Sequence, residues 1–159
     1  MRTCERLVVA ASMSAVGLTW SISVGARVLG TGTAFQSKDN RSVWSGVYTE
    51  EQAKRGEAVY GSQCSSCHGD EMTGTPSAPP LAGDGFLKNW DGKSVNDLVE
   101  KISSTMPADS PGALSPQQTV DVIAFMFDIN KFPAGGTALD ATPTAARLIK
   151  IEAKASQDR

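Results

Sequence analysis

The feature that most constrains this chain is a Cys-x-x-Cys-His motif, formed by Cys64, Cys67 and His68. It contains the only histidine of the 159 residues and two of the three cysteines. A chain with one imidazole cannot build a multi-histidine metal site, a Cys2His2 finger or a two-histidine zinc protease. Its chemistry must therefore be built around one histidine and two nearby thiols.

Cys-x-x-Cys-His is the attachment signature of c-type haem. Two thiols one helical turn apart can add to the two vinyl groups of haem as thioethers, and the adjacent imidazole then lies beneath the iron. A disulfide would leave the histidine unexplained, a thioredoxin-type dithiol needs a strand before the motif, and zinc needs a fourth ligand. The third cysteine, Cys4, lies in the leader described next. The motif favours one haem c, bound covalently through Cys64 and Cys67.

The first 34 residues are typical of a secretory signal peptide. Arg2 and Arg6 form a basic head, and residues 7–26 contain no charged side chain. Cleavage is expected after Ala26 or Ala34; the alternative is an uncleaved membrane anchor, because 20 apolar residues can span a bilayer. Either version exports the rest of the chain, which predicts a periplasmic location.

The remaining chain divides by composition into a linker over 35–44, a domain over 45–133 and a C-terminal tail over 134–159. Apolar spacing and capping residues predict three main helices, over 49–60, 94–103 and 115–129. The last has the strongest signals: Ser115 as N-cap, Pro116 at the first helical position and Gln118 completing a capping box.

The expected fold class is all-α with long loops, because residues 45–130 show no alternating strand pattern. Residues 69–85 are rich in glycine and proline and predict an extended loop. Loops of this length are uncommon in a compact domain unless something else fills the interior. A large apolar cofactor would supply that missing core.

The C-terminal tail leaves two alternatives open, and the net charge argues against nucleic-acid binding. The tail has one ordered-looking stretch, over 145–153, which either packs back on the domain or serves as a docking arm for a partner. Fifteen basic and seventeen acidic side chains give a formal charge of −2. No basic excess exists to recruit nucleic acid.

Several short motifs follow one another in the order found in one protein family. They are Gly56-x-x-x-Tyr60-x-x-x-Cys64-x-x-Cys67-His68-Gly69, Pro79-x-Leu81-x-Gly83, Phe86-x-x-x-Trp90, Met106-Pro107 and Val122-Ile123-Ala124-Phe125. Over residues 49–133 the chain resembles a class I monohaem c-type cytochrome. It is similar to the small cytochromes that accompany periplasmic quinoprotein dehydrogenases. The resemblance implies three main helices and long loops wrapped around one haem.

The resemblance also implies metal ligands, His68 on one side of the iron and Met106 on the other. Met106 lies 38 residues after His68, in a loop between helices, which is far enough for the chain to pass around the haem edge. Met72 is too close to His68 to reach the opposite face, and Met126 falls within the third helix, where core packing is the ordinary role. A surface methionine is the alternative for Met106.

Two supporting residues are expected from the same resemblance. Pro79 matches the family proline whose carbonyl accepts the proximal imidazole N–H, a bond that fixes the histidine tautomer. Trp90 matches the family tryptophan whose indole N–H approaches a haem propionate. The alternatives are a turn proline and a core aromatic.

Three functions remain open at this point. With both axial positions filled and no second histidine, the first is a periplasmic one-electron carrier and not an enzyme. The second is the haem subunit of a periplasmic dehydrogenase complex that passes electrons to a terminal oxidase, with the tail as a docking element. The third is a haem enzyme or gas sensor, which requires an open iron site. The expected partners are redox proteins, a dehydrogenase as donor and an oxidase or another cytochrome as acceptor; a membrane contact is expected only if the leader stays uncleaved.

Overall fold

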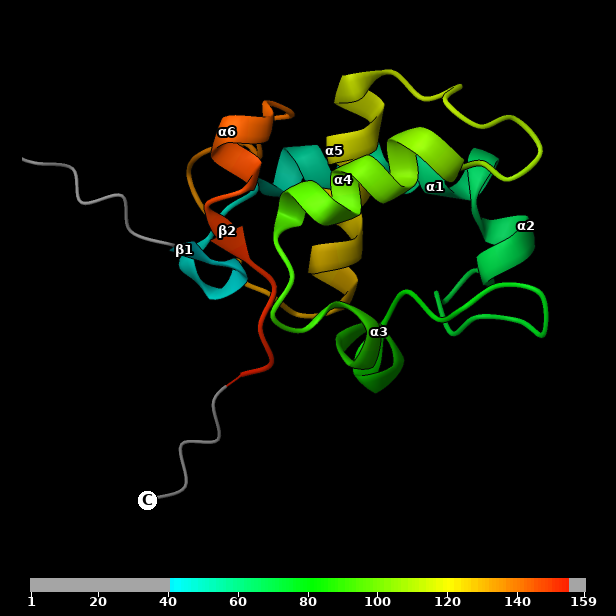
Figure 1. Ribbon diagram of the computed structural model, residues 1–159, viewed down its shortest axis with the longest axis horizontal. Helices are drawn as coiled ribbons and strands as arrows, with labels where there is room; N and C mark the ends of the chain where they lie inside the picture. Colours follow the sequence, from blue (N-terminus) through cyan, green and yellow to red (C-terminus); the bar gives the residue numbers. More distant parts are fainter. Residues whose placement is uncertain (1–40, 155–159) are drawn as a thin grey trace, which may run out of the picture. The chain divides into compact units, whose positions relative to one another are not determined.

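The computed structural model describes residues 41–154, which are mostly helical (Figure 1). In chain order the elements are β1 (Arg41–Ser42), the 3-10 helix η1 (Val43–Ser45), α1 (Glu50–Gln63), α2 (Ser65–His68), α3 (Gly83–Trp90), α4 (Val95–Thr105), α5 (Pro116–Ile129), α6 (Pro143–Ala146) and β2 (Ile149–Lys150). The all-α fold class is confirmed, with one parallel pair of two-residue strands added to it. The signal peptide expected over 1–34 lies outside the described residues.

The three predicted helices begin where their capping residues indicate. Thr49 and Ser115 accept hydrogen bonds from backbone N–H groups three residues on, and Ser115 forms the expected capping box with Gln118. Ser94 does the same for α4. The ends were less predictable, since α1 and α4 continue to Gln63 and Thr105, beyond the expected 60 and 103.

Three α-helices of the described residues were not predicted. α3 begins inside the stretch that was expected to be loop, and its N-cap, Ala82, has no side chain that can cap. α2 and α6 are single turns of four residues each. Such short or uncapped helices carry little local signal, because tertiary packing supplies most of their stability.

The most extensive packing in the domain is between α1 and α5. Gly56 lies at the crossing, and a Cβ there would approach the carbonyl oxygen of Asp121 to 1.8 Å. The ring of Tyr60, one turn along, packs against Phe125 with centroids 5.6 Å apart. Beside the crossing, Arg55 donates to both carboxylate oxygens of Asp121, each at 2.9 Å. The close approach of the two helices therefore depends on the missing side chain of Gly56.

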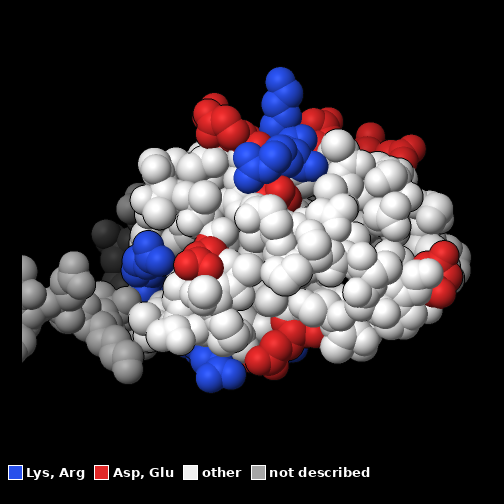
Figure 2. Space-filling view, turned by 90° about the horizontal axis from the view of Figure 1, so that it is seen from above, with Lys and Arg blue, Asp and Glu red and all other residues white. Residues whose placement is uncertain are grey.

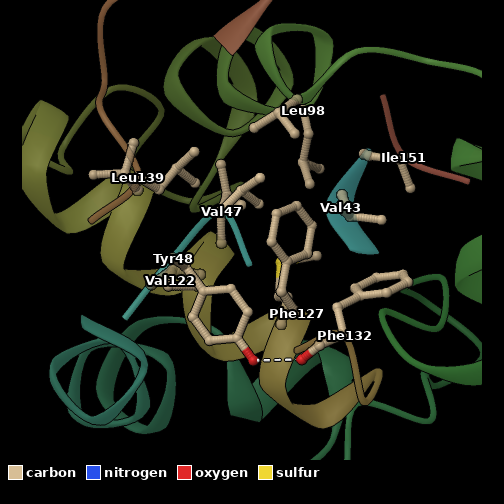
Figure 3. Close-up of a cluster of buried hydrophobic side chains, with 14 of the residues drawn as sticks. Val43, Val47, Tyr48, Leu98, Val122, Phe127, Phe132, Leu139 and Ile151 are labelled. Atoms are coloured by element: carbon tan, nitrogen blue, oxygen red, sulfur yellow. Dashed lines mark hydrogen bonds between the residues drawn. The ribbon is translucent and has the colours of Figure 1, made fainter. Parts of the chain in front are cut away.

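A cluster of buried side chains joins the two ends of the described chain to α5 (Figure 3). Tyr48 donates from its hydroxyl to the carbonyl of Phe132 at 2.7 Å, and the Phe132 ring meets Phe127 edge to face. Val43 and Ile151 are fully buried in the same cluster. The core thus includes residues on both sides of the predicted 45–133 domain.

The expected boundaries at 44 and 134 do not separate structural units. Arg41 donates from its backbone to Leu148 at 2.7 Å, and Gln52 exchanges two hydrogen bonds with the backbone of Leu139. Val43 lies in the core and Trp44 packs against it, so residues 41–44 are not a loose linker, and the tail packs back on the domain through Leu139, Ala146, Ile149 and Ile151. Within residues 41–154 none of the helices has the length and apolar character to cross a membrane.

Candidate functional site

The Cys-x-x-Cys-His motif lies where α1 ends and α2 begins. The backbone N–H of Cys64 still bonds to Tyr60 in the last turn of α1, and the N–H of His68 bonds back to Cys64 at 3.0 Å. This single turn brings Cys64 and Cys67 to the wall of the same cavity. Cys64 is half-buried and Cys67 exposed. Two thiols are thus presented one turn apart, as two thioether bonds require.

The imidazole of His68 is buried, and one of its nitrogens is fixed by a hydrogen bond. Nδ1 lies 2.8 Å from the carbonyl oxygen of Pro79. A carbonyl only accepts, so Nδ1 carries a proton, and in the neutral form of the ring the electron pair is then on Nε2. This is the protonation state that a metal-binding imidazole needs.

Two hydroxyl groups hold the backbone around the motif. Tyr60 donates to the carbonyl of Gly69 at 2.6 Å, and Thr75 donates to the carbonyl of Cys67 at 2.7 Å. Burial raises the pKa of Tyr60 to about 12, with smaller contributions from Cys64 and Asp70. The Tyr60 hydroxyl is therefore protonated and able to donate at any ordinary pH.

A cavity of about 450 Å³ opens beside the motif. Its walls come from α2, the loop over 77–81, the end of α3, α4, the loop after α4 and α5, and they are mostly apolar. All six residues predicted for the site line this cavity: Cys64, Cys67, His68, Pro79, Trp90 and Met106. The volume and the apolar lining are those of a site for a sizeable cofactor.

Met106 follows the last turn of α4 directly. Its N–H bonds to Ile102 at 3.0 Å, and its side chain is half-buried at the cavity wall. Met126 also lines the cavity, although its side chain is only 1% exposed and packs in the core. Met72 is fully buried and lies outside the cavity lining. The structure therefore brings two of the three described methionines to the cavity, where sequence reasoning expected one.

Trp90, the last residue of α3, lies at the cavity edge. Its ring stacks on Phe86 with centroids 6.5 Å apart, and the Lys93 ammonium lies 4.9 Å from the ring centroid. Among residues 41–154 no acceptor is bonded to its indole N–H. A buried or half-buried indole normally finds a partner, so this donor is available to a group in the cavity.

Few charges surround the cavity. The ionisable side chains of its lining are His68, the two cysteines, Lys101 and Asp109. Lys101 and Asp109 are both exposed. Burial raises the pKa of the Cys64 thiol to about 11, with a smaller contribution from Cys67. On the face that Figure 2 shows, acidic and basic side chains are interspersed among uncharged surface. That face presents no extended field of one sign.

These residues fit a covalently bound haem c. The motif supplies two thiols and an oriented imidazole nitrogen on one wall, and the loop after α4 supplies a thioether. Apolar side chains from α4 and α5 provide the surface that a flat hydrophobic ring needs, with Leu98, Ile102 and Val122 among them. A dithiol alone or a zinc ion would not account for the apolar cavity.

Comparison with protein families gives a match over residues 51–126, to the family described as "Cytochrome C oxidase, cbb3-type, subunit III". The matched stretch runs from the first turn of α1 to α5 and includes the motif and Met106. Over these matched residues the chain carries a small monohaem c-type cytochrome domain. Its haem c is bound covalently, with Cys64 and Cys67 at the spacing that attachment requires. The cytochrome domain transfers electrons and exchanges them with other redox proteins.

Other comparisons add little to this assignment. No curated protein matches the chain. One similar solved structure is described as "Crystal Structure of the Sulfane Dehydrogenase SoxCD from Paracoccus pantotrophus", at 24% identity and a TM-score of 0.42. The match covers 70% of this chain and 60% of that one.

Sequence reasoning missed some residues of the site. Lys101 and Asp109 line the cavity of the cytochrome domain, and Asn130 bonds to the loop that follows Pro79. Lys101 and Asp109 look like ordinary surface charges in the sequence. The position of Asn130 after the third helix suggests only a helix end. No local pattern could have related these residues to the motif.

Proposed function

We propose that this protein is a periplasmic one-electron carrier whose haem iron is held by His68 and Met106. When bound, haem c supplies an iron that changes its charge by one electron. The observation that carries the proposal is the joint placement of an oriented His68 imidazole and the Met106 thioether on the walls of one apolar cavity.

The residues of the site have different roles in holding the cofactor and setting its reduction potential. Cys64 and Cys67 tether the cofactor, and the carbonyl of Pro79 keeps Nε2 of His68 as an electron-pair donor. A soft thioether opposite a histidine favours ferrous iron and raises the reduction potential. The apolar lining excludes water, which also favours the less charged state.

Met106 is favoured over Met126 because of how the two side chains are used. Met126 packs in the core with 1% exposure, on a helix whose neighbours hold it there. Met106 is half-buried and sits where α4 gives way to a loop. The Met106 side chain is less enclosed by core packing than that of Met126, so its sulfur can serve as a ligand.

A carrier is favoured over a subunit of a dehydrogenase complex. That second hypothesis came from the resemblance to dehydrogenase-associated cytochromes and assigned the tail the role of a docking element. Leu139, Ala146 and Ile149 of the tail are instead buried against the same domain. A haem enzyme or gas sensor would require an open iron site, which two axial ligands remove.

The axial assignment is tested by spectroscopy of the oxidised holoprotein. We expect the weak long-wavelength band of sulfur-to-ferric-iron charge transfer that the family resemblance implies. Met106→Ala should abolish this band, lower the reduction potential and allow carbon monoxide to bind the reduced protein. Met126→Ala and Met72→Ala serve as controls and should keep the band. A band that survives in Met106→Ala but is lost in Met126→Ala would transfer the assignment to Met126.

The location is tested separately, on cells that express the full chain. The proposal rests on the basic head and apolar run of the leader. Recovery of the mature protein in the periplasmic fraction, with an N-terminus just after Ala26 or Ala34, is the expected result. Recovery of the holoprotein only in the cytoplasm would overturn it.

A further inference from the structure

Asn130, the C-cap residue directly after α5, makes three side-chain hydrogen bonds near the site. Its Oδ1 accepts from the N–H of Gly83 at 2.9 Å, while its Nδ2 donates to the carbonyl of Leu81 at 3.0 Å and to that of Met126 at 2.7 Å. One amide therefore joins the last turn of α5 to Leu81 in the loop after Pro79 and to Gly83, the first residue of α3. Both donors and one acceptor position of the side chain are in use.

The loop that Asn130 holds is the one that orients His68. Leu81 lies two residues after Pro79, whose carbonyl accepts from Nδ1 of His68 at 2.8 Å. The residue between them is Pro80, which has a fixed φ and also restricts the backbone of Pro79. A displacement at Leu81 is therefore passed to the Pro79 carbonyl through a stiff connection.

A second contact leaves this loop little freedom of its own. Leu81 donates from its N–H to the carbonyl of Met72 at 2.8 Å, so its two backbone polar groups bond to different segments. The bonds from Asn130 to Leu81 and Gly83 tie this segment to the long, buried helix α5. Without the bond to Asn130, the backbone of Leu81 would keep only its hydrogen bond to Met72.

We propose that Asn130 is a positioning residue for the axial histidine, acting through Leu81 and Pro79 on the hydrogen bond at Nδ1. This inference rests on the proposed function, in which His68 binds the haem iron. A hydrogen bond from Nδ1 to a carbonyl makes the imidazole a more basic ligand. A more basic ligand stabilises ferric iron, so Asn130 keeps the reduction potential lower than it would be with a loose loop.

The test compares variants of the reduced holoprotein by NMR. In Asn130→Ala, hydrogen exchange at Nδ1 of His68 should be about tenfold or more faster than in the wild type, because local opening exposes this proton. The reduction potential of the same variant should rise. Thr49→Ala is the matched control: it removes the N-cap of α1, at the other end of that helix from the motif, and should leave exchange at His68 and the potential unchanged.

A second variant separates the roles of the amide. Asn130→Asp keeps an acceptor for the N–H of Gly83 but loses both donors, so exchange at His68 should accelerate as it does in Asn130→Ala. If the alanine variant yields no holoprotein, exchange at His68 can still be measured in Asn130→Asp. Exchange at the wild-type rate in either variant, or equal acceleration in Thr49→Ala, would overturn the proposal. A wild type whose spectrum shows no iron-bound imidazole would instead contradict the proposed function.

Discussion

Asp97 completes the capping box at the start of α4. Its Oδ2 accepts from the N–H of Ser94 at 2.8 Å, while the hydroxyl of Ser94 accepts from the N–H of Asp97. The backbone hydrogen bond from Ser94 lowers the pKa of Asp97, helped by the Ser94 hydroxyl and by the nearby charges of Lys150 and Lys93. The ionised carboxylate therefore stabilises the folded state.

This arrangement predicts a pH-dependent contribution to stability. A carboxyl whose pKa is lower in the folded state binds more protons when unfolded, so stability rises with pH through that range. Asp97→Asn should lower the free energy of unfolding by roughly 0.5 kcal/mol at neutral pH, a small value because the carboxylate is exposed. The difference from the wild type should shrink as pH falls below the ordinary carboxyl range.

Denaturant unfolding between acid and neutral pH measures this effect. Glu57→Gln is the control, because Glu57 is exposed on α1 and makes no side-chain hydrogen bond among residues 41–154. A difference between Asp97→Asn and the wild type that stays constant with pH would show that the charge of Asp97 is not what stabilises the helix.

At the scale of helices, the crossing of α1 and α5 depends on Gly56. A Cβ at this position would lie 1.8 Å from the carbonyl oxygen of Asp121, and the backbone of a buried helix cannot move aside locally. Gly56→Ala should lower the free energy of unfolding by about 3 kcal/mol, at the upper end of the usual cost of overpacking. Thermal or denaturant unfolding of the holoprotein measures it.

Gly61 provides the matched control on the same helix. A Cβ there meets nothing within 4 Å, and alanine is the better helix former by about 1 kcal/mol. Gly61→Ala should therefore be neutral or stabilising. Similar losses in both variants would mean that helix propensity or the unfolded state, and not the crossing, explains the effect of Gly56.

The helices differ in how far their own sequence predicts them. α5 was predictable because Ser115, Pro116 and Gln118 are local signals that act within one turn. α3 was not, because Gly83 and Gly85 are poor helix formers and Ala82 cannot cap. Its one fully buried residue, Phe86, packs in a core that only the folded chain assembles.

At the scale of the whole molecule, the tail and the cytochrome domain share one core. Ile151 is fully buried, and its backbone bonds to both Gly92 and Lys93. Ile151→Ala should lower the free energy of unfolding by about 2–4 kcal/mol. Unfolding should remain a single transition, because the tail and the helices lose the same contacts together.

Calorimetry of the holoprotein distinguishes a single unfolding transition from two separate ones. Glu152→Ala, at the next position, is the control: its side chain is exposed, and the carbonyl that bonds to Trp44 is retained. A separate early transition in Ile151→Ala would show that the tail folds independently of the helices.

The site was more predictable than the limits of the domain. Cys64, Cys67 and His68 carry their chemistry in five consecutive positions, so the motif is visible without a structure. The burial of Val43 depends on residues more than 80 positions away, and no local pattern reports such a contact. The same limitation applies to Asn130, whose partners lie 47 and 49 residues earlier in the chain.

The pairing of β1 with β2 brings the first and last described residues to one place. Arg41 bonds to Leu148, and the indole of Trp44 donates to the carbonyl of Glu152 at 2.9 Å. In Figure 1 this pair lies at one side of the domain and α2, with the haem-binding motif, at the other. Adjacent termini are what domain insertion and circular permutation require. Residues 41–154 could therefore be grafted into a surface loop of a host protein through two joins at a single spot, far from the redox centre.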